Sequence, residues 1–207
     1  IYDSSNDILI NEEHFIKPTS PYGKNKEIIE RFLYDVFLSN PKFWKIINLR
    51  YFNPIGAHPL GIIGESPTSI ATNIFPIITK VARGEIKELE IFGNDWLTKD
   101  GTGVRDYVHV MDIAEGHIKA VKYLSNHLPQ IVNVNLGSGK GTSVLELIKA
   151  FESTNHVKIP FSFAPRRRGD KGFVVADNRF AKELLNWEPK KSLEEMCLDG
   201  WNYLFKK

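Results

Sequence analysis

The feature that most limits the possible folds of this chain is the alternation of strand-like and helix-like segments along it. Strand patterns are expected at 44–52, 89–93, 104–110, 131–138 and 159–165. Helix patterns are expected from residue 21 onward, at 69–84, at 111–124 and at 143–153, and two short helices close the chain. Strands that alternate with helices favour an α/β fold with a mainly parallel sheet.

Cap and breaker residues predict several boundaries of these segments. Thr142 is the N-cap candidate of the helix that follows it, and Ser192 with Glu195 forms a capping box at the start of the last helix. Pro76 indicates a kink or a late start within its helix. The sequence "NPIG" at 53–56 stops the first strand, because proline and glycine oppose its continuation.

Composition excludes several classes of protein. The 207 residues are 42% hydrophobic and 25% charged, which is typical of a soluble globular protein. A net charge of +2 gives no general attraction to nucleic acid or membrane, and no apolar run reaches the roughly 20 residues of a membrane span. The single cysteine, Cys197, excludes an internal disulfide and suits a reducing compartment, so we expect a cytoplasmic protein. The six histidines show no metal-binding pattern, and we expect no metal.

Tyr22 and Lys26 lie four residues apart just after Ser20 and Pro21, which predict a helix start. In a helix the two side chains share one face. A phenol with a reference pKa of about 10 becomes a usable base only when a nearby ammonium stabilises the phenolate, and it can then take a proton from a sugar hydroxyl. The same spacing recurs between Tyr203 and Lys207 at the C-terminus, so spacing alone favours ordinary helix surface over a catalytic pair.

The sequence "LGSGKGTS" at 136–143 joins a strand to a helix and contains Gly137, Gly139 and Gly141. The dinucleotide-binding fingerprint requires G-x-G-x-x-G, and here the third glycine comes one residue early. We therefore predict a tight turn. The chain shows no complete phosphate-binding loop for a nicotinamide cofactor.

The dense basic cluster Arg166–Arg168 and the separate Arg105 allow two interpretations. Individually, such arginines are most often solvated charges. Together, Arg105 and Arg167 could hold a diphosphate, which guanidinium groups bind in bidentate fashion.

Read in order, five segments resemble the UDP-glucose 4-epimerase family of the extended short-chain dehydrogenase/reductase superfamily. They are "SPYGKNK", "LRYFNPIGAHPLGIIGE", "IFGNDWLTKDGTGVRDYVHVMDIAEGH", "VNLGSGKGTSVLELIKAFE" and "APRRRGD". The resemblance runs from about Tyr2 to the C-terminal helix. The long insert before "GTGVRDY" is its most discriminating part, because related dehydratases and decarboxylases usually have a shorter turn there.

The resemblance implies an NAD-dependent interconversion of UDP-glucose and UDP-galactose. The hexose is oxidised at C4, rotates as a 4-keto sugar and is reduced on its other face. By position, Tyr22 would be the acid/base, Lys26 would assist it and hold the nicotinamide ribose, and Tyr51 would line the cofactor. The implied residues around the UDP-hexose are Phe52, Asn53, Asn73, Ile74, Glu90, Ile91, Phe92, Arg105, Arg167 and Asp170.

Two departures from the family pattern modify this expectation. The family's first strand, glycine-rich turn and catalytic serine or threonine are not in this sequence, so we expect an N-terminally truncated chain that is inactive alone. Val174 occupies the position that limits the sugar pocket in the family, often tyrosine or cysteine. Valine is much smaller than tyrosine, so we hypothesise that N-acetylated UDP-hexoses also fit the complete enzyme.

The expected organisation is a partial Rossmann-type domain with an interleaved small α/β substrate domain. Residues 1–56 would complete the NAD-binding domain, and 57–207 would form mainly the UDP-sugar domain, with about 104–138 returning to the first. A homodimer is expected for the full-length protein. Three alternatives remain open: another NAD-dependent nucleotide-sugar enzyme, a non-catalytic UDP-sugar-binding module, and a degenerate remnant.

Overall fold

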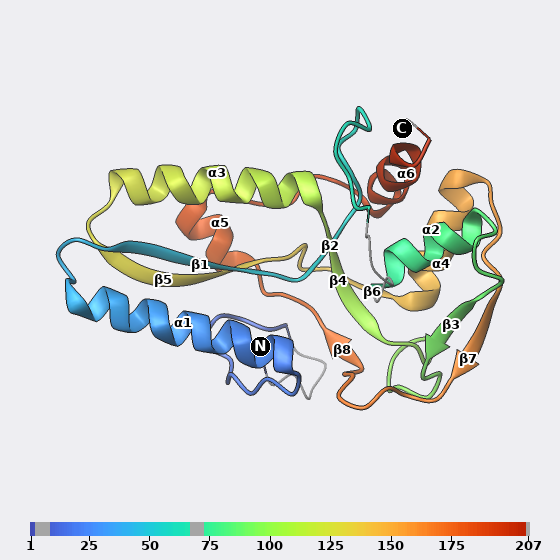
Figure 1. Cartoon of the computed structure of the whole chain (residues 1–207), viewed down its shortest axis with the longest axis horizontal. Helices are drawn as coiled ribbons and strands as arrows, with labels where there is room; N and C mark the ends of the chain where they lie inside the picture. The colour runs from blue at the N-terminus through green and yellow to red at the C-terminus, as the bar shows by residue number, and fades with distance from the viewer. Residues whose placement is uncertain (3–8, 67–72, 206–207) are drawn as a thin grey trace.

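The computed structural model describes residues 1–2, 9–66 and 73–205, which form an elongated molecule with two halves (Figure 1). The sheet half contains α1 (Pro21–Ser39), β1 (Lys45–Tyr51), α3 (Val110–Asn126), β5 (Gln130–Leu136) and α5 (Arg179–Leu185). The pocket half contains β2 (Asn53–Ile55), α2 (Ile74–Ala82), β3 (Leu89–Phe92), β6 (Gly141–Ser143), α4 (Val144–Asn155), β7 (Phe161–Ala164), β8 (Phe173–Val174) and α6 (Leu193–Tyr203). The strand β4 (Val104–His109) runs between the two halves.

Most strand pairs are parallel, which confirms the predicted α/β class. β1 pairs with β5 in parallel from Lys45 opposite Gln130 to Tyr51 opposite Leu136. β4 pairs in parallel with β2 and β8 and antiparallel with β6, while β3 and β7 form a separate parallel pair. The described strands thus form three small sheets, which the strand pattern alone did not predict.

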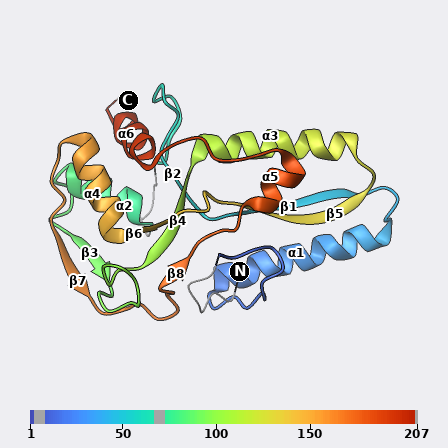
Figure 2. The ribbon, with the colours of Figure 1, turned by 180° about the vertical axis from the view of Figure 1, so that it is seen from behind.

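In the sheet half, β1 and β5 lie between α1 on one side and α3 on the other (Figures 1 and 2). The buried core lies between the strands and α3 with α5, where Leu136 and Trp187 are fully buried. The 19-residue helix α1 buries only Gly23. Neither α1 nor any other helix of the described residues is long and apolar enough to cross a membrane.

A polar contact attaches α1 to the sheet. Arg50 on β1 is almost fully buried, and its Nε and Nη2 donate to the two carboxylate oxygens of Glu30 on α1 at 2.8 and 2.6 Å. Its Nη1 also donates to the hydroxyl of Tyr2 at 2.6 Å. Two parallel guanidinium–carboxylate bonds fix direction as well as distance, so they set how α1 lies along β1.

The pocket half has a continuous apolar core formed by α2, α4, α6 and the strands β2, β3 and β4. Phe151 on α4 is fully buried, and its ring makes edge-to-face contacts with Phe75 and Trp201, with centroids 5.8 and 5.6 Å apart. Leu89 and Ile91 on β3 face the same core. Such close aromatic packing fixes β3 relative to α2 and α4.

The predicted helix starts are mostly confirmed, with one error. Pro21 is the first residue of α1, and Ser20 Oγ accepts from the Gly23 amide at 3.1 Å. The capping box at the start of α6 is also present. The N-cap of α4 is Ser143, in a capping box with Glu146, and the prediction of Thr142 was wrong because Thr142 pairs with Arg105 in the β6–β4 ladder.

The prediction that the first strand ends before residues 53–56 is confirmed for β1. The reason given for it was wrong, because Asn53–Ile55 itself forms a short strand. The chain leaves β1 at Phe52 and pairs with β4 over Asn53–Ile55, a strand so short that Pro54 costs little of the ladder. Pro76 is the third residue of α2, so the late start is confirmed. The part of the predicted 69–84 helix before residue 73 lies outside the described residues.

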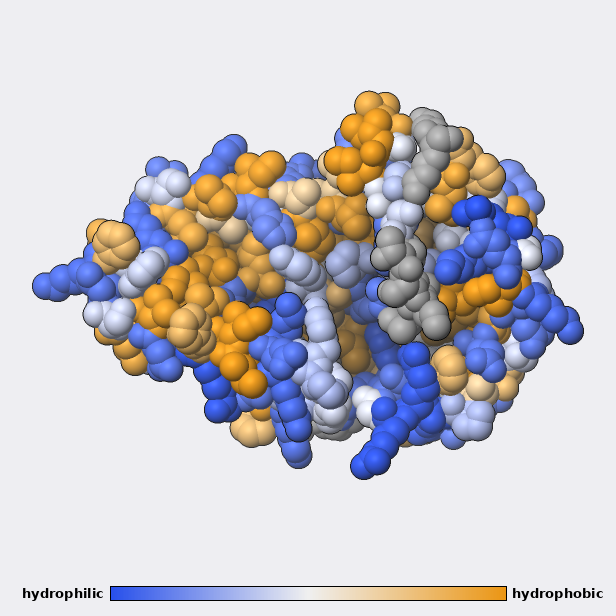
Figure 3. All heavy atoms as spheres, in the orientation of Figure 1, coloured by the Kyte–Doolittle hydropathy of each residue, from blue (hydrophilic) through white to orange (hydrophobic). Residues whose placement is uncertain are grey.

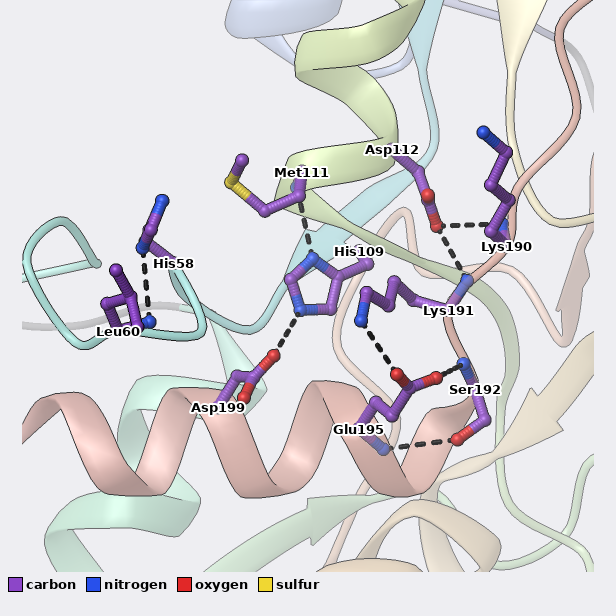
Figure 4. A network of polar contacts seen from close by, with 10 residues as sticks. All are labelled: His58, Leu60, His109, Met111, Asp112, Lys190, Lys191, Ser192, Glu195 and Asp199. Atoms are coloured by element: carbon purple, nitrogen blue, oxygen red, sulfur yellow. Dashed lines mark hydrogen bonds and ion pairs between the residues drawn. The ribbon is translucent and has the colours of Figure 1, made fainter.

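The junction of the halves is built around His109, as Figure 4 shows. This fully buried side chain is the N-cap of α3, because its Nδ1 accepts from the Met111 amide at 3.0 Å. Its Nε2 therefore carries the proton and donates to Asp199 of α6 at 3.2 Å. Burial lowers the pKa of His109, and Asp199 partly offsets that effect.

Candidate active site

One pocket of the pocket half contains most of the residues expected at a nucleotide. It lies between the start of α2, the strands β3 and β4, and the segment after β7. Nine of the eleven predicted substrate residues line it: Asn53, Asn73, Ile74, Glu90, Ile91, Phe92, Arg105, Arg167 and Asp170. Segments more than 100 residues apart in the sequence therefore meet at one site.

A second hollow adjoins the first and contains Tyr22. Asn53, Asn73, Ile74 and Tyr107 line both hollows. Phe52 lines only the one with Tyr22. Val174 lines neither, but it lies opposite Arg105 in the β8–β4 register. The arrangement provides two connected compartments, one rich in arginine and one bearing a phenol.

Arg105 is a cation without a carboxylate partner in the described part of the chain. Its Nη1 donates only to the Val104 carbonyl, at 2.9 Å. Burial lowers the pKa of Arg105; nearby Asp170 opposes this shift, and the positive charge of Arg167 adds to it. A half-buried guanidinium next to a second cation is stabilised by a bound anion.

Arg167 and the first turn of α2 also face this pocket. The Arg167 guanidinium lies 4.5 Å from the centroid of the Phe92 ring, and its Nε donates to Asp170 at 3.1 Å. Asn73 is the N-cap of α2, and its side chain makes no capping hydrogen bond. A helix N-terminus has free amide donors and partial positive charge, both of which favour an anion.

Sequence reasoning missed Tyr107, which lies at the junction of the two hollows. Its side chain is 3% exposed, and within the described residues its hydroxyl has no hydrogen-bond partner. Burial raises the pKa of Tyr107 to about 12, so the group remains an O–H donor. The signal was available, because residues two apart on a strand share a face and Arg105 was already a candidate.

The glycine turn predicted at 136–143 surrounds an internal anion. The buried carboxylate of Asp106 accepts from the Ser138 amide and hydroxyl at 2.6 and 2.5 Å and from the amides of Gly139 and Ala176 at 3.0 and 3.1 Å. Gly139 has a φ of +72°, which glycine adopts readily. The amides that a phosphate would use are thus occupied by Asp106, and the tight turn is confirmed.

Tyr22 and Lys26 lie on one face of the first turns of α1. The Lys26 Nζ is 5.2 Å from the centroid of the Tyr22 ring, and the Tyr22 side chain is 72% exposed. The phenol opens toward the hollow that also holds Phe52 and Asn53. The geometry provides a proton-transfer group next to the arginine-rich pocket.

Tyr51 lies near this pair at the carboxyl end of β1. Burial raises the pKa of Tyr51, and the negative charge of a Tyr22 phenolate would add to that rise. The Nδ1 of His117 is bonded to the Ile113 carbonyl at 2.9 Å, so its Nε2 accepts from the Tyr51 hydroxyl at 2.8 Å. Tyr22, Lys26 and Tyr51 therefore offer a phenol, an ammonium and an oriented ring at the strand end where α/β sheets bind nucleotides, a set that fits the ribose and nicotinamide of a dinucleotide.

Comparisons with known proteins all match this chain to enzymes named for nucleotide sugars. The GDP-mannose 4,6-dehydratase family model matches residues 1–199. The chain is 47% identical over 206 residues to UDP-glucose 4-epimerase GEPI48 of Cyamopsis tetragonoloba, an alignment that covers 100% of this chain and 59% of that protein.

Solved structures give the same result. UDP-glucose 4-epimerase of Bifidobacterium longum in complex with NAD+ and UDP superposes with a TM-score of 0.93 at 40% identity, over 100% of this chain and 61% of that one. UDP-glucose-4-epimerase of Stenotrophomonas maltophila with bound NAD and formylated UDP-arabinopyranose gives 0.89 at 42% identity, over 93% and 56%. The chain thus spans less than two thirds of the length of these relatives.

Proposed function

The chain belongs to the family of the GDP-mannose 4,6-dehydratase model. From this premise and its 47% identity to a UDP-glucose 4-epimerase, we propose that the chain is part of such an epimerase and carries its UDP-sugar site and acid–base pair. The reaction is the interconversion of UDP-glucose and UDP-galactose. The observation that carries the proposal is Arg105, a guanidinium without a carboxylate partner in the described residues that shares a pocket with Arg167 and the start of α2.

In this proposal the pocket half holds the nucleotide. Arg105 and Arg167 bind the diphosphate with the free amides at the start of α2, and Asp170 accepts from a ribose hydroxyl. Glu90 and Phe92 alternate along β3 and line this pocket, and in the proposal they lie beside the uracil. The hexose extends toward Tyr22, where few side chains fix it, so a 4-keto sugar can rotate while the diphosphate stays bound.

Tyr22 performs the proton transfer. Its phenolate, stabilised by the Lys26 ammonium, takes the proton from the C4 hydroxyl and returns it after the sugar has rotated. NAD, when bound, supplies the hydride acceptor and donor for C4. Lys26 and Tyr51 would hold its nicotinamide end, and the His117 acceptor keeps the Tyr51 ring oriented.

The finer substrate range depends on Val174. Val174 lies opposite Arg105. In the proposal a tyrosine at this position would reach into the sugar site of the complete enzyme, whereas valine would leave room for an N-acetyl group at C2 of the hexose. In the complete enzyme, Val174→Tyr should therefore abolish turnover of UDP-N-acetylglucosamine and leave that of UDP-glucose. An equal loss on both substrates would disprove this substrate range.

Organisation and setting follow from the same premise. We propose that 1–56 belongs to the NAD-binding domain and 57–207 mainly to the UDP-sugar domain, with about 104–138 returning to the first. The full-length protein would be a cytoplasmic homodimer, which agrees with a single buried cysteine and with the exposed apolar side chains of α1. Neither nucleic acid nor membrane is proposed as a partner.

A second function is favoured for the chain by itself. The nucleotide pocket is formed by residues of this chain, whereas Tyr22 is 72% exposed and lacks an enclosing environment. The chain alone should therefore bind UDP without turnover. This differs from the proposal for the complete enzyme only in the chemical step.

Two measurements test the proposal. Calorimetric titration of the chain with UDP should give one site, and Arg105→Ala should remove it. For the complete enzyme, NMR analysis of the products of UDP-glucose should show UDP-galactose, because only an epimerase conserves mass. A dehydrated or decarboxylated product would assign the chain to another nucleotide-sugar enzyme, and absence of UDP binding would contradict the site itself.

A further inference from the structure

Two segments at the mouth of the nucleotide pocket are joined by Arg166. We call residues 93–103 the insert loop and 165–172 the arginine segment. The Arg166 Nε donates to the Asp95 carboxylate at 2.7 Å, and its Nη2 donates to the Asp95 carbonyl at 2.6 Å. The same guanidinium lies 3.9 Å from the centroid of the Trp96 ring. One side chain thus makes three contacts across the two segments.

The Trp96 ring lies in a space that two glycines provide. A Cβ on Gly93 would lie 2.6 Å from the Trp96 Nε1, and a Cβ on Gly172 would lie 2.9 Å from its Cε3. Gly93 also has a φ of +84°, which disfavours any larger residue. Gly93 and Gly172 belong to the insert loop and the arginine segment respectively, so both segments are shaped to hold the indole.

Arg167 follows Arg166 directly but contacts different groups. Its guanidinium lies over Phe92, and Arg167 lines the nucleotide pocket with Asp170. Trp96 lines the same pocket, so the contact of Arg166 with Trp96 lies immediately beside the groups proposed to hold UDP.

We propose that Arg166 and Trp96 are positioning residues for the nucleotide: they fix the arginine segment to the insert loop so that Arg167 and Asp170 face Arg105. The proposal rests on the proposed UDP site and adds the residues that hold its geometry. Neither side chain is required to touch the ligand. Arg166 acts through Arg167 and Asp170.

Arg168 provides a matched control within the same segment. It is exposed, and no ion pair, hydrogen bond or ring contact of its side chain is found among residues 1–2, 9–66 and 73–205. Arg166→Ala and Arg168→Ala each remove one positive charge within two positions of Arg167. Long-range electrostatics affects both variants similarly, and only Arg166→Ala breaks the contacts to Asp95 and Trp96.

The first test is calorimetric titration of the 207-residue chain with UDP. Arg166→Ala and Trp96→Ala should each weaken binding about tenfold, while Arg168→Ala stays within about twofold of the wild type. Trp96→Phe keeps an aromatic face for the guanidinium and should recover most of the affinity. Equal affinities of Arg166→Ala and Arg168→Ala would overturn the proposal.

The second test is a double-mutant cycle with Arg167→Ala. If Arg166 acts through Arg167 and Asp170, the loss of UDP affinity in the variant Arg166→Ala/Arg167→Ala should be smaller than the product of the losses in the two single variants. If the loss of UDP affinity in the double variant equals the product of the two single losses, Arg166 acts independently of Arg167 and the positioning role is overturned. The unfolding midpoint of each variant shows that it is folded. If the wild-type chain does not bind UDP, the proposed function itself fails, and this outcome is distinct from equal binding by the two arginine variants.

Discussion

The two halves of this molecule differ in how far the helices α4 and α1 bury their apolar side chains. In the pocket half, Phe151 and Leu147 on α4 are fully buried and belong to a closed core next to the pocket proposed for UDP. In the sheet half, α1 buries only Gly23 and leaves Phe32 63% exposed. Figure 3 shows hydrophobic side chains spread over the sheet half on this face. An exposed apolar helix face of this size is typical of a surface that other protein covers.

This difference in burial separates the residues proposed to bind UDP from the residues proposed to carry out the chemical step. The residues proposed to hold UDP lie against a closed core, so their positions are fixed within this chain. The residues proposed to transfer the proton lie on α1, which is attached through the Arg50–Glu30 pair and few apolar contacts. The comparison therefore predicts that the pocket half binds by itself and that the sheet half needs a partner surface.

The largest expected effect comes from removing one aromatic ring in each half. Phe151→Ala should cost about 3–5 kcal/mol of unfolding free energy, because it leaves a cavity between Phe75 and Trp201. Phe32→Ala on α1 removes the same atoms from an exposed site and should cost under about 0.5 kcal/mol. Urea unfolding followed by circular dichroism measures both. Similar losses would show that the halves do not differ in packing.

The next effect is electrostatic. Arg105→Ala should weaken UDP binding by about tenfold to a hundredfold, since it removes a charged hydrogen-bond donor that has no carboxylate partner among the described residues. Arg31→Ala, on the exposed face of α1, removes the same charge from the sheet half and should leave the affinity within about twofold. Calorimetry at fixed ionic strength distinguishes the two. A comparable loss in both variants would mean that net charge, and not this pocket, attracts the ligand.

A smaller effect on UDP affinity is expected from removing the hydroxyl oxygen of Tyr107. Tyr107→Phe removes a hydroxyl that has no hydrogen-bond partner in the described structure and that belongs to a residue lining both hollows, so unfolding free energy should change by less than about 0.5 kcal/mol. UDP or UDP-glucose affinity should fall by about threefold to tenfold, because the hydroxyl donates to the ligand. Tyr34→Phe on α1 is the control, with no change in either quantity. Loss of stability without loss of affinity would assign Tyr107 to the core alone.

The smallest effect concerns pH at the junction of the halves. Burial lowers the pKa of His109 in the folded state, so the unfolded chain binds the proton more readily. The stability contributed by neutral His109 is therefore present above the unfolded pKa of about 6.5 and is lost as the pH falls below it. The charged groups that face the ring are Asp199, Asp112 and Lys191.

The comparison variant for this prediction is His109→Asn, which keeps an N-cap acceptor for Met111 and does not titrate near neutral pH. Urea midpoints measured from pH 7.5 to pH 5 should fall more steeply for the wild type than for the variant. Parallel curves would show that His109 does not contribute to acid sensitivity.

Sequence reasoning predicted the local elements well and their assembly less well. The helix starts at Ser20 and Ser192 depend on neighbouring residues only, and cap chemistry identified them. The cap at Ser143 was missed because the preceding Thr142 belongs to a three-residue strand whose pairing with β4 is a long-range contact. Division of the strands into three sheets likewise depends on partners that periodicity does not specify.

The same limit applies to the candidate site. Arg105 and Arg167 were identified as residue types that bind phosphate, and their meeting in one pocket came from the resemblance. Trp96 and Arg166 were missed because their roles arise from contacts between distant loops. An arginine beside two others gives no signal until the structure shows which one has a partner. Tyr107, by contrast, could have been found from its place two residues after Arg105 on the same strand.

The most direct test of the comparison between the halves is an amide NMR titration of the isotope-labelled chain with UDP. The account predicts one saturable set of shifts confined to the pocket half, around Arg105, Phe92 and Arg167, with the amides of α1 beyond Lys26 unchanged. Absence of shifts at millimolar UDP, or shifts spread along α1, would contradict the claim that the pocket half alone holds the nucleotide.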